Sequence, residues 1–138
     1  MEERVTAEGH EHVSAEHAST FEVTTDDYLT PAGDCILGIG ADRAPADFAP
    51  AFVEACRDAD ARIEATLRVG DEAATVVGRG HPALTFDDER SLVGRTSEYV
   101  DDRTVLVGAD AAAGDLPRPL VARLADGDPL ELVLTVDA

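Results

Sequence analysis

Hydrophobic and polar residues alternate along several short stretches of this chain, which is the pattern of β-strands with one buried face. The clearest stretch is 62–69, where Ile63, Ala65, Leu67 and Val69 would point to one side. Alternation, β-branched residues or short apolar runs bounded by glycine predict further extended segments near 4–7, 13–18, 19–25, 35–40, 75–78, 91–95, 104–108 and 130–136.

Two segments have helical spacing instead. Phe48, Phe52 and Cys56 belong to an apolar stripe behind Asp47, which predicts a capped helix reaching about residue 57. A second helix is expected at about 118–125. The chain is therefore predicted to be mostly β, with two short helices.

The second half of the pattern repeats the first. Gly9 aligns with Gly80 at an offset of 71 residues, and after a deletion Asp34 aligns with Asp102 at an offset of 68. We call two residues that align in this way counterparts. A position that is alike in both halves is expected to build the unit, whereas a polar residue present in only one half needs another explanation.

The repeat predicts one domain, 1–138, made of two units at about 9–71 and 80–138. One half alone would be a marginal fold, because a chain so short buries too little surface. Each unit has the order β-β-α-β, so the fold class is α+β. We expect the units to interleave into a closed β-barrel with helices over its ends; the alternative is an open sheet with both helices on one face.

Acidic residues greatly outnumber basic residues in this chain. The chain has 29 acidic and 11 basic residues, a net charge of −18, and every basic residue is an arginine. We interpret this acidity as adaptation to a cytoplasm of molar salt, where ions screen the repulsion, rather than as the mark of a basic partner. Nucleic acid is disfavoured as a partner, because aromatic residues for stacking make up only 4% of the chain.

Location follows from the cysteines and the chain start. Two cysteines and a start, Met1-Glu2-Glu3-Arg4, without the features of an export signal predict a cytoplasmic protein with reduced thiols. No apolar run has membrane length, so no membrane partner is expected. Cys56 lies on the helical stripe and is expected in the core.

Several short strings, spread along nearly the whole chain, carry a family resemblance: Gly9-His10, Gly33-Asp34-Cys35, Gly38-Ile39-Gly40-Ala41-Asp42, Leu67-Arg68-Val69-Gly70-Asp71 and Gly78-Arg79-Gly80-His81-Pro82. Together they resemble an archaeal family described as a domain of unknown function, DUF371. The resemblance implies a small archaeal cytoplasmic protein. It implies no activity, substrate or catalytic residue.

Histidines supply the first candidate site. A metal site would take His17 with His10 or His81, completed by Asp34 or Cys35. No motif at ligand spacing supports this set, so no metal is predicted. His10 and His81 each follow a glycine at a turn and are expected to hydrogen-bond the backbone of the next loop in their half, while for His17 both hypotheses stay open.

Two further candidates involve a thiol and a pair of carboxylates. Cys35 beside Asp34 could be a nucleophile, although a free cysteine that opens an apolar strand is commonly packed as a small hydrophobe. Asp42 and its counterpart Asp110 are expected to bond loop backbone; alternatively, two-fold symmetry brings them together around a cation. The glycines before Asp42 are not a phosphate loop, because Arg43 replaces the third glycine.

The broken symmetry locates a hypothetical site in the first half. His17 and Cys35 have Asp88 and Arg103 as counterparts. We hypothesise a site centred on His17 and Asp34, which receives Arg103 from the other half if the strands interleave; the competing explanation is drift in a redundant copy.

These candidates allow three functions. The first is a module that binds a small ligand or a partner protein at the junction of the halves. The second is a metal-assisted or Cys-dependent hydrolase that uses His10, His17, Asp34 and Cys35. The third is an accessory protein of RNA metabolism. The sequence indicates no particular cofactor and no oligomeric state.

Overall fold

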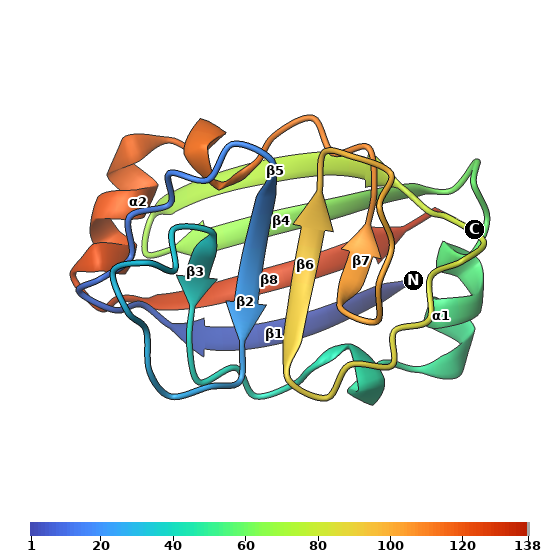
Figure 1. The fold of residues 1–138 in the computed structure, drawn as a ribbon, viewed down its shortest axis with the longest axis horizontal. Coiled ribbons are helices and arrows are strands. Elements are labelled where there is room, and N and C mark those ends of the chain that lie inside the picture. The colour runs from blue at the N-terminus through green and yellow to red at the C-terminus, as the bar shows by residue number, and fades with distance from the viewer. Residues whose placement is uncertain (138) are drawn as a thin grey trace.

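The computed structural model describes residues 1–137, and it contains two four-stranded sheets and two short helices (Figure 1). Sheet A is antiparallel and consists, in spatial order, of β1 (Glu2–Glu8), β8 (Pro129–Val136), β4 (Arg62–Val69) and β5 (Glu72–Arg79). Sheet B consists of β3 (Ile36–Gly38), β2 (Thr20–Thr24), β6 (Ser91–Arg95) and β7 (Thr104–Leu106). Within sheet B, β2 and β6 are antiparallel, and each short outer strand runs parallel to its neighbour.

The core lies between the two sheets, whose strands cross one another in Figure 1. Every second residue of β4 and β8 is buried, because one face of sheet A is covered by sheet B. From sheet B, Phe21 enters the core opposite Gly94. A Cβ atom on Gly94 would collide with the Phe21 ring, so the large and the small residue fit only as a pair.

The helices cover opposite ends of the molecule (Figure 1). Helix α1 (Pro50–Cys56) follows a 3₁₀ turn, η1 (Pro45–Asp47), and α2 (Arg118–Ala125) follows η2 (Ala113–Asp115). Asp47 was predicted to cap the helix, but it closes the 3₁₀ turn that precedes the helix. Its carboxylate accepts a hydrogen bond of 2.9 Å from the Ala44 N–H and closes η1, whereas α1 begins three residues later, at a proline, which suits a first helical turn.

Several predicted elements are confirmed, and one is wrong. Strands 62–69 and 91–95 and helix 118–125 have the predicted bounds. The predicted extended segment 13–18 is a loop. It contains Ala15 at φ 48°, a left-handed conformation that ends any strand.

The mostly β, α+β class is confirmed, but no closed barrel is found among residues 1–137. The two sheets are linked by isolated bridges, Glu8 to Ile39 at one corner and Arg79 to Val107 at the other. Because β3 and β7 have only three residues each, they cannot continue the ladder around the corners. The barrel and the repeat therefore stay predictions.

Candidate functional site

His10 and His81 bond the backbone as expected, but each bonds its own loop, two residues further on, rather than the next loop. The Nδ1 atom of His10 accepts a hydrogen bond of 3.0 Å from the His12 N–H, and that of His81 accepts one of the same length from the Ala83 N–H. The two loops lie apart, because the His10 N–H bonds the end of α2 and the His81 N–H bonds the end of α1. The structure therefore does not bring these histidines into one site.

His17 and its counterpart Asp88 do the same structural work. The His17 Nδ1 atom accepts bonds from the N–H groups of Ser19 and Thr20, at 3.2 and 3.1 Å. One oxygen of Asp88 accepts bonds from the N–H groups of Arg90 and Ser91 in its own turn, at 2.8 and 2.7 Å. Both side chains thus order the turn that leads into a central strand of sheet B.

Asp42 and Asp110 fasten loops to the edges of sheet A. The Asp42 carboxylate accepts a bond of 2.9 Å from the Thr6 N–H on β1, and Asp110 accepts one of 2.9 Å from the Val77 N–H on β5. Strands β8 and β4 separate these two edges. The two carboxylates therefore do not meet around a cation.

Asp34 does not join His17 and Cys35 in one site. It borders a hollow of about 570 Å³ with Glu11 and His12, and neither His17 nor Cys35 lines that hollow. The main-chain carbonyl of Asp34, rather than its carboxylate, accepts the N–H of His17 at 3.2 Å.

Cys35 is a protonated thiol at neutral pH. Burial and the neighbouring Glu22 carboxylate raise the pKa of this thiol to about 11, and its Sγ lies 3.6 Å from Glu22 Oε1. A nucleophilic cysteine needs the opposite environment, one that stabilises the thiolate. Cys56 is fully buried in the core, as expected.

Arg103 meets a carboxylate of the first half, but this carboxylate is Glu22 and not the predicted Asp34. Arg103, from the second half, places Nη1 3.8 Å from Glu22 Oε1 on β2. Glu22 lies directly opposite its own counterpart, Val93, in the register of β2 and β6. Cys35 and its counterpart Arg103 both approach Glu22, so the two halves meet at this side chain.

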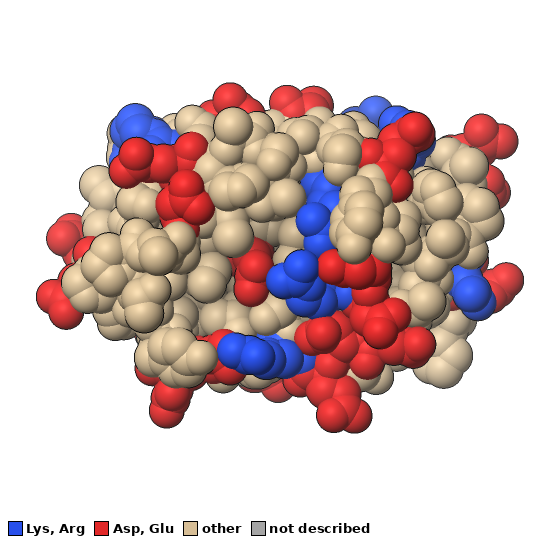
Figure 2. All heavy atoms as spheres, viewed as in Figure 1, with Lys and Arg blue, Asp and Glu red and all other residues tan. Residues whose placement is uncertain are grey.

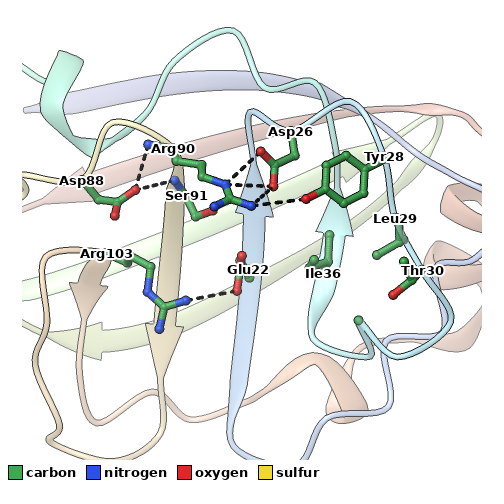
Figure 3. Close-up of a pocket in the computed structure, with 11 residues that line it drawn as sticks. Glu22, Asp26, Tyr28, Leu29, Thr30, Ile36, Asp88, Arg90, Ser91 and Arg103 are labelled. Atoms are coloured by element: carbon green, nitrogen blue, oxygen red, sulfur yellow. Dashed lines mark hydrogen bonds and ion pairs between the residues drawn. The ribbon is translucent and has the colours of Figure 1, made fainter.

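A cavity of about 290 Å³ opens beside Glu22 on the outer face of sheet B (Figure 3). The first half contributes its apolar wall, and residues of both halves contribute its charged wall. Its lining residues are Glu22, Asp26, Tyr28, Leu29, Thr30, Gly33, Ile36, Asp88, Arg90, Ser91 and Arg103.

The two arginines of the cavity are already paired with carboxylates. Arg90 Nε and Nη2 donate hydrogen bonds of 2.6 to 2.9 Å to Asp26, and Arg90 Nη2 lies 3.4 Å from the Tyr28 hydroxyl. Arg103 Nε and Nη2 lie 3.3 and 3.1 Å from Asp101. Within residues 1–137, by contrast, Glu22 has only its long contacts with Arg103 and Cys35, although its side chain is just 15% exposed.

In the second half, an arginine fills the equivalent space. Arg95 is buried and donates 2.9 Å hydrogen bonds to Thr104 and Asp101. Its guanidinium carbon lies 4.9 Å from the centre of the Tyr99 ring. The counterpart of Arg95 is Thr24, a buried residue with a much shorter side chain, whose hydroxyl accepts a hydrogen bond of 3.1 Å from the Ser91 hydroxyl.

Asp101 gives this filled region its electrostatic character. Partial burial alone would raise the pKa of Asp101, but hydrogen bonds from Arg103 and Thr104 and the charge of Arg95 outweigh it and lower the pKa to about 2. Arginines gather in the middle of this face in Figure 2, with acidic side chains around them. Each of these arginine charges has a carboxylate partner, so the face offers little to a nucleic-acid backbone.

The sequence-based candidates missed the residues that matter most here. Glu22 carried a usable signal, because its counterpart is the apolar Val93. Arg90 and Asp26 carried none, since they are 64 residues apart and pair only through the strand register. Of the eight candidates, only Arg103 lines the cavity.

Two classes of site have no support in residues 1–137. Within that range, no group of three or more His, Cys, Asp or Glu side chains is arranged to hold a metal ion. No helix in the described part of the chain has the length and apolar character needed to cross a membrane.

The fold and the cavity thus define a two-sheet α+β protein with a small polar hollow on one sheet. The chain belongs to the family described as "Domain of unknown function (DUF371)", whose model matches residues 5–137. It is also 39% identical over 130 residues to the "Uncharacterized protein MJ0206" of Methanocaldococcus jannaschii, covering 94% of this chain and 96% of that protein. The family expected from the sequence is confirmed, and this relative supports an archaeal origin.

Proposed function

We propose that this protein binds a small molecule in the cavity beside Glu22. The observation that carries the proposal is a mostly buried carboxylate, 15% exposed, that lines a cavity and has no short ionic partner in the described part of the chain. Desolvating a carboxylate is unfavourable unless it is paired. The fold itself does not require the charge, because Val93 fills the matched position.

The dimensions and lining of the cavity support this function. Its volume of about 290 Å³ lies at the lower end of the range for ligand sites. Leu29 and Ile36 supply an apolar wall, while Glu22, Ser91 and Arg103 supply polar groups that could orient a ligand. Residues of both halves line it, as expected for a site at their junction.

We also propose that the domain arose from two repeats and works in the cytoplasm. Matched contacts support the repeat: Ala15 and its counterpart Phe86 have φ angles of 48° and 53°, and Asp42 and Asp110 fasten matched edges of sheet A. Two free cysteines agree with a reducing compartment.

A fragment screen by protein-observed NMR in molar potassium chloride tests ligand binding. Binders should shift the amides of Glu22, Ile36 and Ser91, and Tyr28→Ala should weaken them by removing a cavity wall. Tyr99→Ala is the matched control, because Tyr99 is the similarly exposed counterpart outside the cavity. The proposal fails if no fragment shifts the cavity amides, or if both tyrosine variants have the same effect.

Glu22→Val provides the second arm. Valine is the residue that the other half uses at this position, so the variant should fold and keep its free energy of unfolding or raise it by about 1 kcal/mol. Binding in the cavity should nevertheless be lost. If the Glu22→Val protein binds every fragment as the wild type does, the Glu22 carboxylate has no role in ligand binding.

A further inference from the structure

The cavity and the region around Arg95 are formed by counterpart residues of the two halves. In the second half, the place is occupied by a guanidinium group that stacks on Tyr99 at 4.9 Å and bonds Asp101. In the first half, the tyrosine persists as Tyr28, but the arginine is replaced by Thr24. No cation lies over the Tyr28 ring within residues 1–137, and 57% of Tyr28 is exposed.

The anchoring groups of the filled half are also replaced. Thr104 has Ile36 as its counterpart, and Asp101 aligns with Gly33, so the open half lacks both acceptors that hold Arg95. Glu22 supplies a carboxylate that the filled half lacks, because Val93 stands there. In Figure 3, Ile36 lies beside Glu22 on the neighbouring strand, and Leu29 and Thr30 lie beyond Ile36.

Charge also favours a cation. Three carboxylates and two guanidinium groups line the cavity. Both guanidinium groups hold carboxylates through short hydrogen bonds, whereas the ion pair of Glu22 is 3.8 Å long. The least satisfied charge on the wall is therefore negative, and the chain as a whole carries −18.

We propose that the ligand of this cavity carries a small organic cation, a guanidinium or alkylammonium group, that binds Glu22 and stacks on Tyr28. This inference rests on the proposed function and specifies its ligand class. Charge-assisted hydrogen bonding to Glu22 and cation–π contact with Tyr28 supply the selectivity. Arg95 is the intramolecular version of the same arrangement.

Titration with three small probes tests the ligand class. Methylguanidinium is the cationic probe, methylurea is its neutral isostere, and acetate represents anions, each followed by NMR at the Glu22, Ile36 and Ser91 amides in molar potassium chloride. Methylguanidinium should bind at least about tenfold more tightly than methylurea, the ratio that one hydrogen bond to a charged group supplies. Methylammonium tests whether planarity is needed; binding equal to that of methylguanidinium extends the same class.

Variants separate Glu22 from the general acidity of the chain. Glu22→Gln should reduce the preference for methylguanidinium over methylurea to about onefold, whereas Glu11→Gln, at an exposed acid outside the cavity, should leave it unchanged. Tyr28→Ala should weaken methylguanidinium binding, and Tyr99→Ala should not.

Equal binding of methylurea, tighter binding of acetate, no binding of methylguanidinium, or an unchanged preference in Glu22→Gln would each overturn the cation proposal. None of these results would contradict the proposed binding function, which the fragment screen tests separately. Fragments that bind the cavity without a cationic group would leave the binding function standing while removing its cationic ligand.

Discussion

The outer face of sheet B contains two matched regions that differ in how their space is filled. Around Tyr99, the chain supplies its own guanidinium group and the carboxylate and hydroxyl that hold it. Around Tyr28, the chain supplies an apolar wall, a cavity and a carboxylate without a close partner.

The difference shows how one backbone arrangement can serve two purposes. Arg95 makes its region a closed ionic cluster that contributes to stability. Thr24 has a much shorter side chain than Arg95, and under the proposed function a ligand occupies the equivalent region. Under the proposed function, the comparison of position 24 with position 95 separates a binding role from a structural role, and substitutions in either region test it.

Salt should have the largest effect, and it should act on both regions together. Raising potassium chloride from low to molar concentration screens the repulsion of a net charge of −18, and excluded salt then strengthens burial of apolar surface. The midpoint of thermal unfolding should therefore rise strongly at first and continue to rise. A midpoint that does not respond to salt would remove the halophilic interpretation.

Arg95→Ala should destabilise the fold more than any other single substitution in the two regions. It leaves Asp101 without its least exposed partner and opens a space under Tyr99, so the free energy of unfolding should fall by about 2–4 kcal/mol. The matched control is Thr24→Ala, which removes the two hydrogen bonds that the Thr24 hydroxyl accepts from the Asp26 N–H and the Ser91 hydroxyl, and should cost about 1–2 kcal/mol. Urea unfolding in molar salt measures both, and equal losses would mean that Arg95 is no more structural than Thr24.

Asp101→Asn should change how stability depends on pH. The pKa of Asp101 is about 2 in the folded protein, below the ordinary 3.8, so its stabilising contribution is present above about pH 4 and is lost as pH falls toward 2. At neutral pH the substitution should cost about 1–2 kcal/mol, allowing for screening of a partly exposed side chain.

Unfolding free energies from pH 2 to 6 measure this change. The difference between wild type and Asp101→Asn should shrink as the pH falls through that window. A constant difference would show that the carboxylate charge contributes nothing.

Features determined by residues close together in the sequence were predictable, whereas features determined by residues far apart in the sequence were not. Strand 62–69 was predictable, because alternation of buried and exposed residues is local and strong. The loop at 13–18 was not predictable. Its left-handed residue is Ala15, whereas glycine and asparagine are the residues that signal this conformation in a sequence.

The site depended on register, which local patterns do not give. Glu22 meets Arg103 only because β2 pairs with β6 and β7 follows β6 in the sheet. A site was predicted at His17 because its counterpart, Asp88, is a different residue type. A difference in residue type is not always a difference in role, because an imidazole nitrogen and a carboxylate oxygen accept the same two N–H bonds.

His17→Asp should therefore have the smallest effect of all. The aspartate would accept the N–H groups of Ser19 and Thr20 as Asp88 does in its own turn, so the free energy of unfolding should stay within about 0.5 kcal/mol of the wild type. His17→Ala and Asp88→Ala, which remove the acceptor, should each cost about 1 kcal/mol. If His17→Asp abolishes methylguanidinium binding while its stability is unchanged, His17 acts on the ligand and the turn explanation is wrong. If all three variants bind the probe as the wild type does, the difference between His17 and Asp88 is drift between two equivalent acceptors.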